Sequence, residues 1–260
     1  MLPIAHRHPN YLLLDAPERI REQLSRYIEW VPLTKGQVLS APDLPARYAY
    51  FPATSVLSLV ATTPDGQTAE VATVGNEGML DVSSLLCGEP SWYTAVVREP
   101  GSSYRCSATT LRHELSCSTN LQPWLLRYLQ SLLTQMTQTA LCNRYHTLSE
   151  QLCRYLLQSL DRSDSASLAV THECIANRLG VRREGVTEAL GRLRAQDIVD
   201  CDRGVITVND PTGLKELACK CYKIFARATR PCAPPQRARA RHVSPCAPAL
   251  VAASSSHVWA

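Results

Sequence analysis

Residues 171–194 contain the side chains with the most specific chemical capacity in this 260-residue chain. Four polar residues in the second half of the segment recur at helical spacing and therefore share one face of a helix: Arg183, Glu184, Thr187 and Glu188. An arginine can donate two hydrogen bonds to guanine O6 and N7, and a glutamate can accept one from cytosine N4. The pattern predicts a surface that reads base edges in a DNA major groove. The alternative is an ordinary solvated face of mixed charge.

Three further residues have the chemistry of phosphate contacts, which fix the register of a protein on DNA without reading its sequence. Thr171 offers a hydroxyl at the start of the segment, and Arg182 stands beside the base-reading face. Arg203 lies downstream, in a tight turn with Gly204. We expect these three side chains to contact the DNA backbone.

The elements that must position these side chains are two short helices joined by a turn. Thr171 is a good N-cap for the first helix, and Gly180 supplies the left-handed backbone that ends it. Apolar residues at helical spacing would bury both helices: Ile175, Leu179, Val186, Ala189, Leu190 and Leu193. Residues 198–208 then alternate in polarity around Arg203-Gly204, which predicts a β-hairpin. The whole segment predicts a winged helix-turn-helix.

Upstream, residues 31–106 consist of short β-rich runs separated by turn signals, which predicts an antiparallel roll. Pro64-Asp65-Gly66 predicts a hairpin between two apolar strands, and residues 94–106 predict another pair of strands around Pro100-Gly101. Residues 31–106 contain no histidine, and the chain has no Gly-rich phosphate loop, Gly-x-Ser-x-Gly or His-Glu-x-x-His motif. We therefore do not expect an enzyme.

A helical pattern begins at Asn120 and has two apolar faces. One face is a heptad seam formed by Leu126, Leu129, Leu133, Met136 and Ala140. The neighbouring face is formed by Leu121, Leu125, Tyr128 and Leu132. A helix with two apolar faces must bury both, so we expect one to pack on its own domain and the other on the same helix of a second subunit. The alternative is a helix buried inside one monomer.

A capping box from Thr147 to Glu150 begins the next helix and places a domain boundary near residue 147. Four segments are expected: an N-terminal helix and sensor roll (1–119), a dimerisation helix (120–147), a winged helix-turn-helix (148–225) and a disordered Pro/Ala/Ser-rich tail (226–260). The formal net charge of the whole chain is +4, and all seven charged residues after Glu216 are basic. Local clusters, and not bulk charge, therefore support a nucleic-acid partner.

The chain has 11 cysteines, no export signal and no apolar run long enough to span a membrane. We therefore expect a cytoplasmic protein with free thiols and no membrane partner. Cys219 and Cys221 form a Cys-x-Cys pair, but residues two apart on a helix point to nearly opposite sides. We expect no metal site, and redox sensing by exposed cysteines stays open.

The order of a roll, a heptad helix and a winged helix over residues 10–225 resembles the bacterial cyclic-AMP receptor/fumarate-nitrate regulator (Crp/Fnr) family. Particular runs carry the resemblance: Lys35-Gly36-Gln37-Val38-Leu39, Tyr50-Phe51-Pro52, Val74-Gly75-Asn76-Glu77-Gly78-Met79, Cys142-Asn143-Arg144-Tyr145-His146, Thr171-His172-Glu173 and Leu179-Gly180-Val181-Arg182-Arg183-Glu184. The resemblance implies an α+β fold and a homodimeric transcription regulator that binds a palindromic operator in double-stranded DNA. It also implies RNA polymerase as a partner and a signal that acts on the roll.

By the same resemblance, Arg183 and Glu184 fall on base-reading positions, and Glu188 stands where the family usually has a basic residue. Members that bind cyclic AMP grip its phosphate with an arginine, but no arginine occurs between Gly75 and Val97. We therefore expect no cyclic AMP in the usual position. The first cysteine is Cys87, so the N-terminal iron–sulfur ligands are absent and no such cluster is expected.

The effector is unidentified, with Tyr93 and Thr94 as the candidates for contact with it. An alternative function is a dimeric module that binds a ligand or docks a protein without contacting DNA. A steep loss of DNA affinity with rising salt would distinguish a true regulator from such a module.

Overall fold

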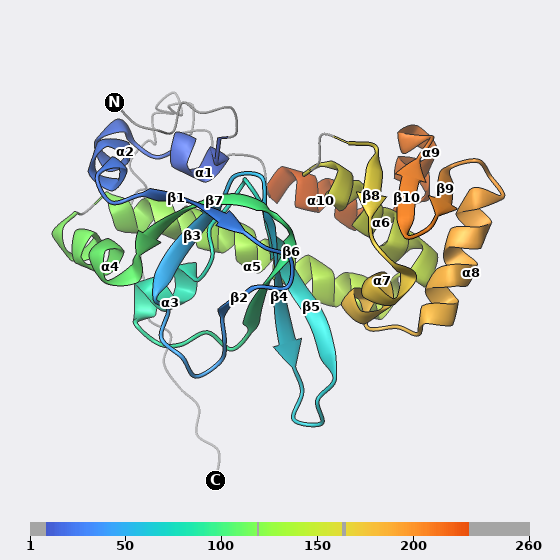
Figure 1. Ribbon diagram of the computed structural model, residues 1–260, viewed down its shortest axis with the longest axis horizontal. Coiled ribbons are helices and arrows are strands. Elements are labelled where there is room, and N and C mark those ends of the chain that lie inside the picture. The colour runs from blue at the N-terminus through green and yellow to red at the C-terminus, as the bar shows by residue number, and fades with distance from the viewer. Residues whose placement is uncertain (1–8, 119, 163–164, 229–260) are drawn as a thin grey trace, which may run out of the picture.

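The computed structural model describes residues 9–118, 120–162 and 165–228, and it contains a roll, a long helix and a winged helix-turn-helix (Figure 1). This α+β architecture is the one expected. Most of the predicted tail lies outside the described residues. Its first three residues, 226–228, complete helix α10 (Cys221–Ala228), so the expectation of disorder from residue 226 was wrong there. The buried Phe225 and Cys221 attach this helix to the domain.

The roll consists of two antiparallel sheets. One has the strand order β1 (Glu29–Leu33), β7 (Gly101–Ser107), β3 (Tyr48–Pro52). The other has the order β2 (Val38–Ser40), β6 (Thr94–Glu99), β4 (Val56–Thr62), β5 (Thr68–Val74). Apolar side chains form the core of the roll, and removing their surface from water stabilises it.

The sequence predicted two turns in the roll, and the structure confirms one of them as a hairpin but not the other. The hairpin at Pro64-Asp65-Gly66 is confirmed, because β4 pairs with β5 and Gly66 has φ +82°. The strands on either side of Pro100 also exist, but they do not pair with each other. The chain crosses from one sheet to the other at this point. A side chain at Gly101 would lie 2.7 Å from the backbone of Ser55, so the crossing requires glycine.

Four helices surround the roll: α1 (Tyr11–Leu14), α2 (Glu18–Ser25), α3 (Val82–Cys87) and α4 (Ala108–Cys117). The expectation that helical structure begins at Asn120 overlooked α4, although its apolar residues Ala108, Leu111 and Leu115 recur at helical spacing. Its buried Leu111 packs into the roll core.

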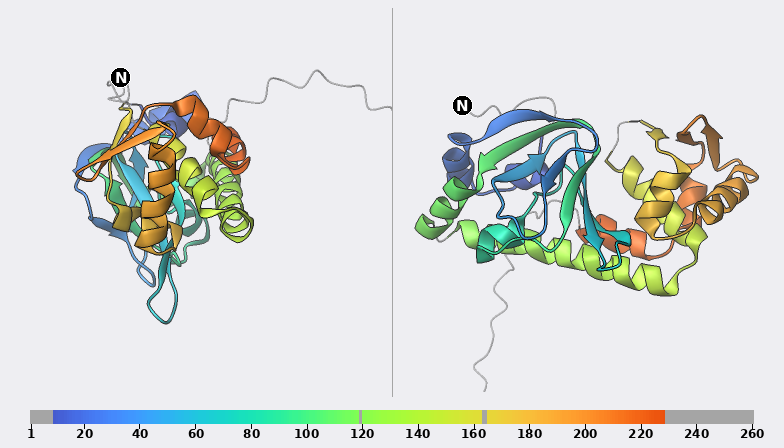
Figure 2. Two further views of the ribbon diagram at one scale, coloured as in Figure 1. Left: turned by 90° about the vertical axis from the view of Figure 1, so that its right-hand side faces the viewer. Right: turned by 60° about the horizontal axis from the view of Figure 1, so that its bottom comes forward.

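Helix α5 (Leu121–Tyr145) runs along the roll and continues to the C-terminal domain (Figures 1 and 2). Leu125 and Leu132 are buried against the roll. The Tyr128 hydroxyl donates to the carbonyl of Met79 at 2.9 Å, and Gln135 Oε1 accepts from the backbone N–H of Thr73 at 2.8 Å. These contacts fix which face of α5 lies on the roll.

The C-terminal domain has its own hydrophobic core. Its helices are α6 (Leu148–Leu160), α7 (His172–Leu179), α8 (Arg183–Arg194), α9 (Pro211–Leu217) and α10. Its three-stranded sheet has the order β8 (Ser167–Ala169), β10 (Val205–Val208), β9 (Val199–Asp202). None of the helices described in the chain has the length and apolar character needed to cross a membrane.

Candidate nucleic-acid interface

The turn between α7 and α8 is built as the sequence predicts. Thr171 Oγ1 accepts a hydrogen bond from the N–H of Cys174 at 3.2 Å and caps α7. Gly180 adopts φ +66°, and the N–H of Val181 donates to the carbonyl of Ala176 at 3.0 Å. This geometry ends α7 and redirects the chain into α8.

Helix α8 packs closely against α6 because Gly185 has no side chain. A Cβ atom at this position would lie 2.9 Å from Cδ2 of Leu148. Val186, Ala189 and Leu190 bury the inner side of α8, so its outer side faces solvent. The glycine therefore has a packing role that offsets its low helix propensity.

All four predicted base-reading residues are exposed on α8. Arg183 is the first helical residue, and Glu184 lies in the first turn. Neither side chain has an ion pair or hydrogen bond with another residue that the structure describes. Their charged groups are therefore free to contact a partner. Arg182 is the N-cap residue, is exposed, and makes no side-chain capping bond.

Thr187 and Glu188 are instead held by other side chains. The Thr187 hydroxyl donates to the carbonyl of Arg183 at 3.1 Å and lies 2.9 Å from Nδ1 of His172. Glu188 pairs with Arg192 at 2.5 Å. His172 and Arg192 were not predicted as partners. The Glu188–Arg192 pair could have been found from its i,i+4 spacing, but no local pattern links His172 with Thr187.

The hairpin of β9 and β10 forms the wing, as expected. Its turn contains Arg203 at φ +44° and Gly204 at φ +82°. A hollow of about 440 Å³ between the wing and the starts of α7 and α8 is lined by Arg203, Thr171 and Arg183. Three of the predicted DNA-contacting residues therefore meet in space although they come from three elements. Arg194 also lines the hollow, where it pairs with Asp200 at 3.2 Å, and was not predicted.

The heptad seam lies partly on the exposed side of α5 and partly at the edge of the roll core. Leu126 is 46% exposed and Leu133 is 49% exposed, and Ala140 is also exposed. Leu129 and Met136 are half-buried at the edge of the roll core. The described chain leaves this leucine stripe uncovered.

The predicted effector contacts lie at the end of the roll beside α3. Asp81 is buried, adopts φ +60° and accepts a hydrogen bond from Ser91 at 2.7 Å. Burial raises the pKa of the Asp81 carboxyl, and the Ser91 hydrogen bond opposes that rise. Burial raises the pKa of Tyr93, and the charge of the nearby Asp81 adds to this rise. Thr94 is half-buried at the start of β6.

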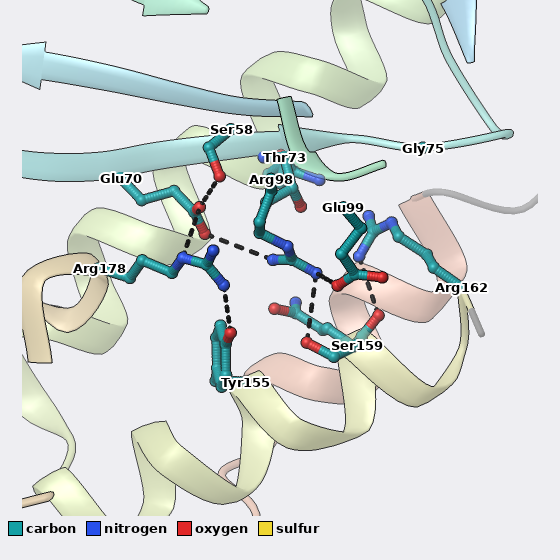
Figure 3. A network of polar contacts seen from close by, with 12 residues as sticks. Ser58, Glu70, Thr73, Gly75, Arg98, Glu99, Tyr155, Ser159, Arg162 and Arg178 are labelled. Atoms are coloured by element: carbon teal, nitrogen blue, oxygen red, sulfur yellow. Dashed lines mark hydrogen bonds and ion pairs between the residues drawn. The ribbon is translucent and has the colours of Figure 1, made fainter. Parts of the chain in front are cut away.

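Arg98, the first arginine after this region, is buried and points toward the C-terminal domain (Figure 3). Its Nη2 lies 3.1 Å from Glu99 Oε1 and 3.2 Å from Ser159 Oγ, and its Nη1 lies 3.8 Å from Glu70 Oε1. The Arg98 guanidinium therefore already contacts side chains on β5, β6 and α6.

A polar network joins the roll to the helix-turn-helix (Figure 3). Glu70 on β5 accepts a hydrogen bond from Ser58 and lies 3.9 Å from Nε of Arg178 on α7. Arg178 also donates to the hydroxyl of Tyr155 on α6. The network was not predicted, because its members are far apart in the sequence.

Comparison with known proteins matches both halves of the chain. The cyclic nucleotide-binding domain family matches residues 30–116, and the Crp-like helix-turn-helix domain family matches residues 150–217. The chain is 25% identical over 189 residues to the global nitrogen regulator of Nostoc sp., covering 69% of this chain and 85% of that protein. It is 24% identical over 191 residues to the global nitrogen regulator of Synechococcus elongatus, covering 70% and 86%.

Solved structures of regulators share the fold. FixK2 from Bradyrhizobium japonicum aligns with a TM-score of 0.64 at 19% identity, covering 74% of this chain and 98% of FixK2. A Crp/Fnr-family transcriptional regulator from Thermus thermophilus aligns with a TM-score of 0.60 at 23% identity, covering 73% and 98%. The family comprises transcription regulators and not enzymes, and the matched helix-turn-helix supports DNA binding over the alternative of a module without it. This chain belongs to the Crp/Fnr family of DNA-binding transcriptional regulators.

Proposed function

We propose that this regulator acts as a homodimer that pairs through α5 and binds a palindromic DNA site. The observation that carries the proposal is the uncovered leucine stripe on α5, with Leu126 and Leu133 about half exposed. Pairing this stripe with its copy would remove apolar surface from water. A two-fold dimer would present two α8 helices to half-sites about 34 Å apart, which is one turn of DNA.

Within each half-site, Arg183 and Glu184 read bases, because their groups are exposed and have no partner among the described residues. Thr187 and Glu188 complete the face, held in place by His172 and Arg192. Thr171, Arg182 and Arg203 contact phosphates. The hollow that Thr171 and Arg203 share with Arg183 supports this division, since it brings phosphate-binding and base-reading groups together.

The signal acts through the roll and the junction between α5 and α6. The α5 helix ends at Tyr145, and Thr147 caps α6 with a full capping box. A change in the roll would alter the contacts of Glu70 with Arg178 and of Arg98 with Ser159, and so rotate the winged helix at residues 143–147. We place the hinge of this rotation at residues 143–147, where α5 ends and α6 begins.

Cyclic AMP in the family's usual position does not fit the residues present. The buried Asp81 would repel a phosphate at the start of α3, and Arg98 is engaged with Glu70 and Glu99. We assign neither cyclic AMP nor an iron–sulfur cluster to this chain, and the effector that contacts Tyr93 or Thr94 is of another class. The alternative sensing groups are exposed free cysteines such as Cys87 and Cys117, which would act by redox chemistry.

As a regulator of this kind, the protein would work in the cytoplasm, recruit or block RNA polymerase, and catalyse no reaction. The test is selection of bound sequences from a random DNA pool with the full chain. We expect an inverted repeat whose half-sites are one helical turn apart. Enrichment of single half-sites only, together with sedimentation of single chains on DNA, would contradict the dimer.

A further inference from the structure

Four potential metal ligands meet where α5 ends and α10 begins. Cys142 and His146 are four residues apart on the last turn and C-cap of α5. Cys219 lies between α9 and α10, and Cys221 is the first residue of α10. One ligand atom from each residue, three sulfurs and an imidazole nitrogen, lies within 4.8 Å of every other.

The sequence argument against a metal at Cys219 and Cys221 assumed that both lie on a helix. That assumption was wrong, because Cys219 precedes α10 and a turn at Lys220 separates the two cysteines. Both sulfurs can therefore face the end of α5. The Cys-x-Cys pair supplies two ligands from one side, and the Cys142-x₃-His146 pair supplies two from the other.

The distances fit a tetrahedral site. Cys142 Sγ lies 3.5 Å from Cys219 Sγ, and Cys221 Sγ lies 3.6 Å from His146 Nδ1. In a tetrahedral zinc site the ligand bond lengths imply about 3.8 Å between two sulfurs and about 3.6 Å between a sulfur and a nitrogen. These two separations need to change by only a few tenths of an ångström to accept the ion.

Packing of the buried thiols as small apolar side chains explains less of this arrangement than a metal site does. Cysteines behave as small hydrophobic residues, and Cys142, Cys219 and Cys221 are buried. Apolar packing gives no reason for an imidazole to direct Nδ1 at this cluster. The 3.5 Å between Cys142 and Cys219 is also longer than the roughly 2.05 Å of a disulfide, and both cysteines are free.

A buried cation beside the cluster matches the charge of a metal–thiolate site. Arg154 on α6 is 5% exposed, and its charge acts on both Cys142 and Cys221. Its Nε has no hydrogen-bond partner among the described residues. A zinc ion with three thiolates and a neutral histidine carries one net negative charge, which Arg154 would offset.

We propose that Cys142, His146, Cys219 and Cys221 bind one zinc ion. All four positions would be filled by protein, which is typical of a structural site and leaves no position for a substrate. Because α10 lies beside α5 (Figure 1), the ion would fasten the C-terminal helix to the end of α5 at the junction of the two domains. The proposal depends on neither dimer formation nor DNA binding.

Metal content of the full chain, purified under reducing conditions without added chelator, gives the first test. We expect elemental mass spectrometry to find one zinc per chain. The Cys219→Ser variant and the Cys221→Ser variant should each lose that zinc. Two matched controls should keep it: Cys117→Ser, which removes an exposed cysteine 3.8 Å from His113, and Cys232→Ser/Cys246→Ser in the tail. Zinc that disappears only with a control would place the ion elsewhere and overturn the proposal.

Cobalt binding to the unaltered protein removes dependence on whether the variants fold. After chelation and anaerobic addition of Co²⁺, we expect the strong visible bands of tetrahedral thiolate coordination at one equivalent. Added Zn²⁺ should replace the cobalt and raise the melting temperature. Absence of these bands, or a Cys142–Cys219 disulfide in protein kept anaerobic and reduced, would overturn the assignment.

Discussion

Arg162 Nη2, just beyond α6, lies 2.7 Å from Glu77 Oε1 in the turn that follows β5. The two side chains are 7% and 11% exposed, so this pair is largely removed from water. A Cβ atom on Gly75 would lie 2.9 Å from Arg162 Cδ, which shows how closely the turn approaches the arginine. The pair is a direct charged link between the roll and the C-terminal domain.

Removing one partner of this buried pair should destabilise the protein strongly. We expect Glu77→Gln to lower the free energy of unfolding by about 3–5 kcal/mol, because Arg162 is left as a buried charge without its partner. Urea denaturation of Glu77→Gln, Arg162→Met and the double variant measures this. The double variant should lose clearly less than the sum of the singles, whereas additive losses would contradict a direct interaction.

Arg183 and Arg182 should differ in their effect on DNA binding. Arg183→Ala should cost about 1–3 kcal/mol on the selected site and relax the preference at one base position. Arg182→Ala should weaken binding to all sequences and make affinity less dependent on salt. Fluorescence anisotropy over a salt series, on the selected site and on single-base variants, separates the two. An equal loss on every sequence for Arg183→Ala would assign Arg183 to a phosphate.

A charge within the leucine stripe of α5 should separate the subunits. We expect Leu133→Glu to shift the protein from dimer to monomer in analytical ultracentrifugation, since a carboxylate would have to be buried at the interface. Leu44→Glu is the matched control, because Leu44 is 61% exposed and lies on the roll. A Leu133→Glu protein that stays dimeric would show that another surface joins the subunits.

The two glycines of α8 should respond differently to alanine. Gly191→Ala should stabilise the protein by about 1 kcal/mol, because a Cβ atom there meets nothing within 4 Å and alanine favours helix. Gly185→Ala should gain less, since Leu148 must move to admit the new methyl group. Thermal or urea denaturation of both variants checks the difference. An equal gain would mean that the approach of α8 to α6 is looser than described.

Asp81→Asn should stabilise the protein at neutral pH. Burial raises the pKa of Asp81 in the folded state, so folding favours its protonated form. That contribution is fully present below the unfolded pKa of about 4 and is lost as pH rises through the folded value. Asparagine stays neutral and tolerates the positive φ of this position. The advantage of the variant at pH 7 should therefore shrink as pH falls toward 4, and a constant difference would contradict the burial cost.

The sequence alone predicted the features that depend on neighbours along the chain. The Thr171 cap, the Gly180 turn and the Arg203-Gly204 hairpin each arise from residues within a few positions of one another. The leucine seam of α5 follows from helical period, and its exposure shows which face the roll leaves uncovered. Caps, turns and the apolar faces of helices depend on residues that are close together in the sequence, so the order of residues predicts them.

Only the tertiary structure decided which distant side chains meet. Cys142 and Cys219 are 77 positions apart, and Arg162 and Glu77 are 85 apart. No period or spacing connects such residues, because their proximity depends on how α10 packs on α5 and how the roll packs on α6. The assumption that Cys219 lies on a helix was therefore wrong, and the contacts of Arg98 with Glu70 and Glu99 were likewise not foreseen.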